Sequence, residues 1–318
     1  MNTIVKSALF GASLFAVAAS GTGLALAQDG EAPTIVVVTH GQANDPFWSV
    51  VKNGVEQAAK NTGANVSYRA PETFDMVAMS QLIDAAVNQE PDGLAVSVPD
   101  ADALRQSIER AVAAGIPVIT LNAGADVSKD LGALLHVGQS EYEAGRRAGE
   151  RLAELGGTNG ICVNQEVGNV SLDQRCEGFA EGFGNTTEVL PTTNDPADVE
   201  AKVRAALQSN GEIDTILALG AATAGEPSVA AVESLNRLDD VNIASFDLSA
   251  NFLQAVADGK ADFAIDQQQF LQGYLPVSFL NLDARYGLMP AGDVPSGPNF
   301  VTQDNAQQVI ELSSQGIR

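Results

Sequence analysis

The sequence predicts an α/β fold with parallel sheets, and three observations lead to that prediction. Short runs of apolar and β-branched residues alternate with helical segments, mostly of about 10–15 residues. Such alternation is typical of right-handed βαβ units. The first strand, 34–39, is apolar on both faces, as expected for a strand buried inside a parallel sheet. The roughly 290 residues after the first 27 suffice for two domains, and each half holds about five βα units.

The stretch after the first strand has the features of a ligand-binding loop. Asp45 can cap the free backbone N–H groups of a helix that continues to about residue 61, and Pro46 suits its first position. Ligands of open α/β sheets bind beyond the carboxyl ends of strands. The side chains expected there are His40, Gln42, Asn44, Asp45, Phe47 and Trp48. Two aromatic rings beside amides and a carboxylate suit the apolar face and hydroxyl rim of a sugar.

The remaining elements follow the same alternation. Further strands or apolar runs are expected at 65–69, 93–98, 116–121, 131–137, 160–164, 188–190, 215–219, 241–246 and 262–265. Helices are expected at 75–88, 101–114, 140–155, 172–183, 197–208, 226–235, 249–257, from the 266–273 segment to about 286, and at 302–313. Ser140 and Glu143 have the spacing of a capping box. Residues 290–298 form a connection rich in Pro and Gly.

The first 27 residues have the pattern of a secretory signal peptide. Lys6 precedes an apolar stretch at 8–19, and Ala25-Leu26-Ala27 matches a small-x-small cleavage site. A retained membrane anchor is the alternative. Elsewhere, no segment approaches the roughly 20 apolar residues needed to span a bilayer. We therefore expect an exported protein.

Charge and cysteine content narrow the functional classes. The formal net charge of −23 argues against nucleic acid and against anionic lipid surfaces, which are bound by clustered Lys and Arg. Cys162 and Cys176 are the two cysteines, and an even count in an exported chain indicates one disulfide. We expect no metal site, because no histidine lies near either cysteine in the sequence.

Several short motifs occur in an order that resembles a known family. They are Asn44-Asp45-Pro46-Phe47-Trp48, Ala114-Gly115-Ile116-Pro117-Val118-Ile119, Glu177-Gly178-Phe179, Phe246-Asp247, Asp266-Gln267 and Gln272-Gly273. With the signal peptide, this ordered set resembles the periplasmic sugar-binding proteins of the ribose-binding type, which feed ABC importers. The resemblance covers essentially the whole chain after the signal peptide.

The resemblance implies two Rossmann-like lobes, each a parallel sheet flanked by helices, joined by a three-strand hinge and closing on one sugar. The N-terminal lobe would comprise residues 28–137 and 267–294. The C-terminal lobe would comprise residues 138–266 and 295–318. Crossovers would lie near 137–138, 266–267 and 295–297.

The resemblance also assigns ligand-binding positions. These fall on Asn44, Asp45, Phe47, Trp48, Asn122, Asp247 and Gln267. Asp173 stands where the family has an arginine, and Arg175 follows two residues later, so both are candidates. Ribose binders have Asp-Arg where this chain has Asn122-Ala123, which favours a related sugar or polyol over ribose.

Simpler roles remain open for some of these residues. Asp247 could cap a helix, Gln267 could serve only in the hinge, and Asn122 could cap its turn. Glu166 and Gln139 also follow strands and are weaker candidates. His40 and His136 are interpreted as structural.

The predicted function is non-catalytic: a monomer captures a monosaccharide or polyol in the periplasm and delivers it to the permease of an ABC importer. No cofactor or metal is expected. A sensory protein that presents its closed form to a chemoreceptor or sensor kinase is the alternative. An enzyme finds little support, because the common hydrolase, nucleotide-binding and metalloprotease motifs are absent from the sequence. Asp45 and Asp247 could still form a carboxylate pair as in a glycosidase.

Overall fold

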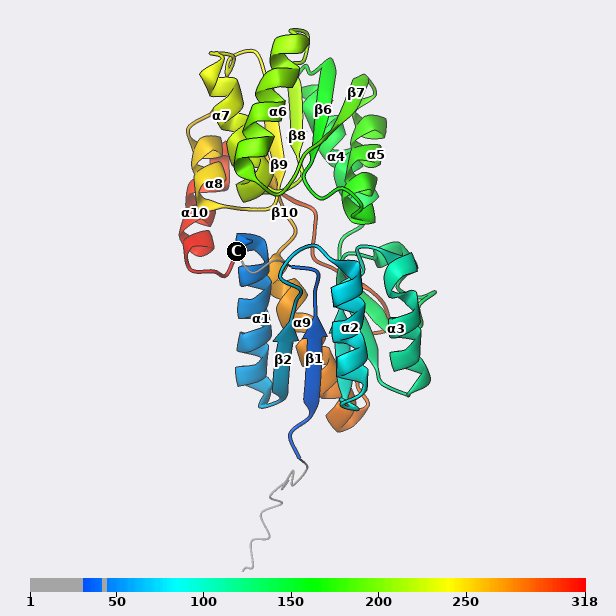
Figure 1. Ribbon diagram of the computed structural model, residues 1–318. Coiled ribbons are helices and arrows are strands. Elements are labelled where there is room, and N and C mark those ends of the chain that lie inside the picture. The colour runs from blue at the N-terminus through cyan, green and yellow to red at the C-terminus, as the bar shows by residue number, and fades with distance from the viewer. Residues whose placement is uncertain (1–30, 42–44) are drawn as a thin grey trace, which may run out of the picture. The chain divides into compact units, whose positions relative to one another are not determined.

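The structure is a computed structural model that describes residues 31–41 and 45–318. The described residues form two six-stranded sheets with helices on both faces (Figure 1). The strand orders are β11-β5-β4-β3-β1-β2 and β12-β10-β9-β8-β6-β7, so one doubly wound arrangement occurs twice. The predicted α/β class is confirmed. One detail differs: β12 is antiparallel to β10, whereas the other paired strands are parallel.

The first sheet lies between two pairs of helices. Its strands are β1 (Thr34–Val38), β2 (Asn65–Arg69), β3 (Gly93–Val96), β4 (Val118–Asn122), β5 (Leu135–Gly138) and β11 (Val294–Pro295). Its helices are α1 (Pro46–Thr62), α2 (Met76–Val87), α3 (Ala101–Ala113) and α9 (Gln269–Tyr286), with a short 3₁₀ turn η1 at Ala125–Val127. Because side chains alternate along a strand, Ile35 and Val37 pack with α1 and α9, while Val36 and Val38 pack with α2 and α3.

The second sheet is covered in the same way. Its strands are β6 (Asn159–Asn164), β7 (Thr186–Pro191), β8 (Thr215–Ala218), β9 (Asn242–Phe246), β10 (Phe263–Asp266) and β12 (Asn299–Thr302). Helices α4 (Glu141–Glu154) and α5 (Val170–Phe183) cover one face. Helices α6 (Pro196–Ser209), α7 (Glu226–Ser234), α8 (Ala250–Ala257) and α10 (Gln303–Ser314) cover the other (Figure 1).

The chain passes between the two sheets at three places. It leaves the first sheet after Gly138, returns after Asp266, and leaves again between Pro295 and Asn299. As a result, α9 packs beside α1 on the first sheet, and α10 packs beside α8 on the second. Because of these passages, residues at strand ends of the first sheet lie near residues at strand ends of the second.

The largest differences from the predicted elements occur where the pattern is short. β11 and β12 were not predicted, because they lie in and just after the connection rich in Pro and Gly. A π-helical turn, η2 (Ala221–Gly225), precedes α7 and was also missed. At α4, Ser140 Oγ accepts the Glu143 N–H at 3.3 Å, but the Glu143 carboxylate binds Arg146 instead of completing the capping box.

The predicted disulfide between Cys162 and Cys176 is present and joins β6 to α5. The predicted signal peptide lies outside the described residues. Within 31–41 and 45–318, no helix is long and apolar enough to cross a membrane.

Candidate ligand-binding site

A hollow with about 380 Å³ of empty space opens beside strand ends of both sheets. Its lining residues are His40, Asp45, Phe47, Trp48, Asn122, Gln165, Glu166, Asn169, Ser171, Leu172, Arg175, Leu219, Asp247 and Gln267. Each lies at the carboxyl end of a strand or in the first turns of the helix that follows. This is where doubly wound sheets bind ligands.

One wall of the hollow is aromatic and is held by the start of α1. Asp45 caps the helix, and its Oδ1 accepts the Phe47 N–H at 2.9 Å. The ring centroids of Phe47 and Trp48 lie 5.0 Å apart, and that of His40 lies 4.6 Å from Trp48. Gly41 permits this packing, since a Cβ there would lie 2.2 Å from the indole. The wall therefore offers apolar surface to a ligand.

His40 contributes to this wall as a neutral ring. Its side chain is buried, and both its backbone N–H and its Nδ1 form hydrogen bonds with Ser97 Oγ. Burial lowers the pKa of His40 to about 4, and the Glu166 carboxylate only partly opposes that shift. His136 does not line the hollow; it bonds to Thr120, and burial lowers its pKa to about 4 as well.

Another part of the lining belongs to a connected set of amides. Gln267 Nε2 donates to Asp247 Oδ1 at 2.6 Å, and Gln267 Oε1 accepts from Asn122 Nδ2 at 3.2 Å. Gln272 completes the network: its Nε2 donates to Gln267 Oε1 at 2.9 Å and its Oε1 accepts from Asn122 at 3.1 Å. Since Asn122 and Asp247 come from different sheets, this network joins the two sheets through hydrogen bonds.

Asn122 and Asp247 both have left-handed backbone conformations, with φ of 62° and 70°. Such angles are uncommon outside glycine, and when found they often mark functional positions. Burial raises the pKa of Asp247 to about 6 and that of Asp45 to about 7. Among the described residues, Asp247 Oδ2 has no hydrogen-bond partner, so that oxygen is available to a ligand.

Arg175 is the only arginine or lysine among the lining residues given above, and two of its guanidinium nitrogens donate to groups of the protein. Its Nε donates to Glu141 Oε2 at 2.6 Å, its Nη1 donates to the Leu219 carbonyl at 3.1 Å, and its guanidinium lies 4.2 Å from the centre of the Phe246 ring. Burial opposes the charge of Arg175, but Glu141 and Asp247 raise its pKa. The site therefore combines one paired cation with the carboxylates of Asp45, Glu166 and Asp247.

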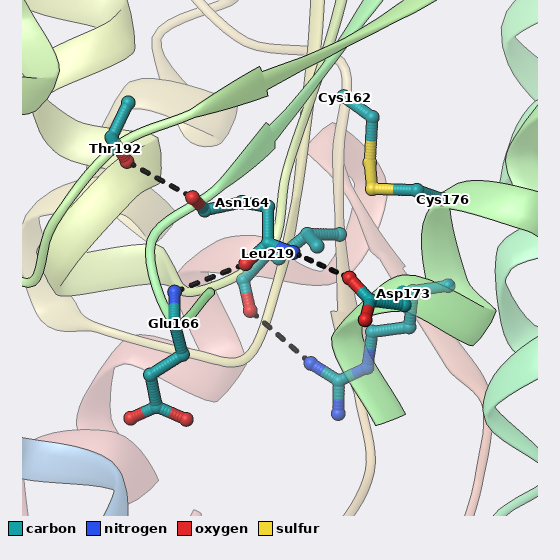
Figure 2. Close-up of a disulfide and its surroundings, with 8 residues drawn as sticks. Cys162, Asn164, Glu166, Asp173, Cys176, Thr192 and Leu219 are labelled. Atoms are coloured by element: carbon teal, nitrogen blue, oxygen red, sulfur yellow. Dashed lines mark hydrogen bonds between the residues drawn. A yellow bond between two sulfur atoms is a disulfide. The ribbon is translucent and has the colours of Figure 1, made fainter. Parts of the chain in front are cut away.

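Asp173 occupies a different place from Arg175. Figure 2 shows its carboxylate beside Asn164, whose Nδ2 donates to Asp173 Oδ1 at 3.0 Å, close to the disulfide. Asp173 lines a separate hollow next to Cys162 and Cys176. The structure thus places Arg175, and not Asp173, at the site.

The structure brings together most of the residues predicted for the site. Those lining the hollow are Asp45, Phe47, Trp48, Asn122, Arg175, Asp247 and Gln267. Asn44 and Gln42 lie outside the described residues. Glu166, a weaker candidate, lines the hollow, whereas Gln139 does not.

Several residues at the site were not predicted from the sequence. Glu141 and Gln272 act behind the lining residues, and the missed lining residues are Gln165, Asn169, Ser171, Leu172 and Leu219. Asn169 had a usable signal: it is the N-cap of α5, where its Oδ1 accepts the Ser171 N–H at 3.1 Å. Glu141 had none, because its buried partner lies 34 positions away.

Two similar doubly wound sheets with a polar and aromatic site at their strand ends define the class of substrate-binding proteins with two α/β lobes. The comparisons with known proteins agree. Residues 35–282 match the family described as periplasmic binding protein domain. This chain belongs to that family, as the ordered motifs predicted.

Individual relatives are similar over most of the chain. A carbohydrate transporter from Acidothermus cellulolyticus, solved in complex with myo-inositol, is 34% identical with a TM-score of 0.85, covering 91% of this chain and 100% of that one. A xylose/arabinose-binding protein of Sulfolobus acidocaldarius is 27% identical, covering 95% of this chain and 80% of the relative. A ribose import binding protein of Bacillus subtilis is 26% identical, covering 73% and 75%.

Proposed function

We propose that this chain is the solute-binding component of an ABC sugar importer, and that it captures a monosaccharide or polyol in the hollow beside the strand ends of both sheets. The observation that carries the proposal is the composition of the hollow, which combines an aromatic wall with a network of amides and carboxylates. Amides both donate and accept hydrogen bonds, which suits hydroxyl groups. Carboxylates accept charge-assisted hydrogen bonds from hydroxyl groups. The names of the relatives, which bind xylose, arabinose, ribose or myo-inositol, support the same ligand class.

The ligand-binding residues in this proposal are Asp45, Phe47, Trp48, Asn122, Arg175, Asp247 and Gln267, with Asn44 as a further contact. The excess of carboxylates over cations favours an uncharged ligand over a sugar acid or sugar phosphate. The family consists of substrate-binding proteins, so the carboxylates of Asp45 and Asp247 are assigned to binding and not to hydrolysis.

Capture by closure needs two lobes and a hinge. We propose lobes of residues 28–137 with 267–294 and of 138–266 with 295–318, connected where the chain passes between the sheets. Closing them on a ligand would be a hinge motion. The closed monomer would then dock on the importer's permease.

The family implies a location outside the cytoplasm. We propose that residues 1–27 form a cleaved signal peptide and that the mature chain acts in the periplasm.

Calorimetry against myo-inositol, D-xylose, L-arabinose, D-ribose, D-fructose and D-allose tests this function. Because Trp48 is the only tryptophan in the chain and lines the hollow, intrinsic fluorescence reports on the site directly. We expect at least one of these ligands to produce heat and a matching change in fluorescence. Absence of both for the whole panel would contradict the proposal.

A further inference from the structure

The disulfide lies directly beside the cationic residue of the site. Cys176 follows Arg175 in α5, and Cys162 lies in β6, the strand whose end carries Gln165 and Glu166 into the hollow. Both cysteines are buried, with exposed fractions of 1% and 4%. The covalent bond therefore ties α5, which supplies Arg175, to β6, whose end supplies Gln165 and Glu166.

α5 packs closely against α4, where Gly145 and Gly178 let the two backbones approach, but its side towards the edge strand β7 is open. A second hollow lies against the disulfide and is lined by residues of α5 and the edge strand β7. Val189 on β7 faces this region with an exposed fraction of 49%. Besides the disulfide, the bond from Asn164 Nδ2 to Asp173 Oδ1 is a side-chain tie between the end of β6 and the start of α5 (Figure 2).

The contacts of Arg175 require its side chain to be placed accurately. Glu141 comes from α4, the Leu219 carbonyl from the end of β8, and Phe246 from β9. A hydrogen bond weakens steeply as its distance and angle leave their narrow optimum. A small displacement of α5 relative to the sheet would therefore disturb the contacts with Leu219 and Phe246.

We propose that the Cys162–Cys176 disulfide is a positioning element for Arg175, which keeps the first turns of α5 against β6 so that the guanidinium remains in the ligand site. The inference rests on the proposed function only for its effect on ligand affinity. The effect of the disulfide on the position of Arg175 can be measured in the ligand-free protein.

The ligand-free test uses the variant Cys162→Ala/Cys176→Ala and the ¹⁵Nε–¹Hε NMR signal of Arg175, identified by its loss in Arg175→Lys. In the natural protein, the buried bond to Glu141 should protect this proton from exchange with water. Without the disulfide, we expect faster exchange and a shift towards the position of exposed arginines. If this variant fails to fold, Cys162→Val/Cys176→Ala, which refills part of the space of the sulfur atoms with an apolar side chain, provides the same comparison.

The second measurement is affinity for whichever panel ligand binds most tightly. We expect a loss of about tenfold or more, the scale of one hydrogen bond to a charged group. Val203→Ala is the matched control, because Val203 is a fully buried α6 residue on the other face of the same sheet. It should lower thermal stability without changing the Arg175 signal or the affinity.

Two results would overturn the positioning role. One is an unchanged Arg175 signal and affinity in the protein without the disulfide. The other is the same pair of changes in Val203→Ala, which would make the disulfide a source of general stability only. If no panel ligand binds the natural protein, the proposed function fails, while the NMR measurement still decides the role of the disulfide.

Discussion

The ion pair between Arg175 and Glu141 allows a stability prediction with a defined magnitude. The two side chains are 4% and 2% exposed, and Nε lies 2.6 Å from Oε2. Two unit charges about 4 Å apart attract by about 4 kcal/mol at an effective dielectric constant of about 20. Removing each charge from water costs several kcal/mol, so the net contribution of the pair is small. Loss of one partner, however, leaves the other charge buried and uncompensated.

We therefore expect Arg175→Met and Glu141→Ala each to lower the free energy of unfolding by about 3–5 kcal/mol. The double variant should cost at least about 2 kcal/mol less than the sum of the two, because it removes both charges. Urea denaturation at neutral pH, followed by circular dichroism and by the fluorescence of Trp48, measures all four proteins of the cycle.

An exposed pair provides the control. Arg105 and Glu109 approach to 3.4 Å with side chains 39% and 53% exposed, so Arg105→Ala should cost less than about 1 kcal/mol. Additive costs at Arg175 and Glu141, or costs no larger than that of the control, would refute the account of a buried and mutually dependent pair.

Three further predictions concern the site. Burial raises the pKa of Asp247 from 3.8 to about 6, so the folded protein holds that proton more strongly than the unfolded chain and loses stability as pH rises through this interval. Asp247→Asn should reduce this loss in urea midpoints measured across the interval, and an unchanged slope would show that another group is responsible. Gln267→Ala should cost about 1–3 kcal/mol by leaving buried amides without partners, whereas Gln106→Ala, at an exposed position, should have little effect on the urea midpoint. Gly41→Ala places a carbon 2.2 Å from the Trp48 indole and should alter the indole fluorescence and weaken ligand binding. Gly211→Ala, with open space around it, should change neither. An unaltered indole spectrum in Gly41→Ala would contradict this packing.

Features that depend on neighbouring residues could be predicted from the sequence. The alternation of strands and helices, the cap at Asp45 and the aromatic pair after it are local patterns, and the structure contains them. The disulfide was predictable because an exported chain with two cysteines has a single intramolecular pairing. The strands β11 and β12 were not predictable in this way, because they lie in and just after a Pro- and Gly-rich connection and exist through pairing with distant strands.

The choice between Asp173 and Arg175 required the tertiary structure. Residues two positions apart on a helix point in directions about 160° apart, so they cannot both face the site, and the sequence alone does not say which one does. The same holds for Glu141 and Gln272, which reach the site through partners far along the chain. Local sequence determines which segments become strands and helices, whereas the packing of α5, α4 and α9 against the sheets determines which of their side chains meet.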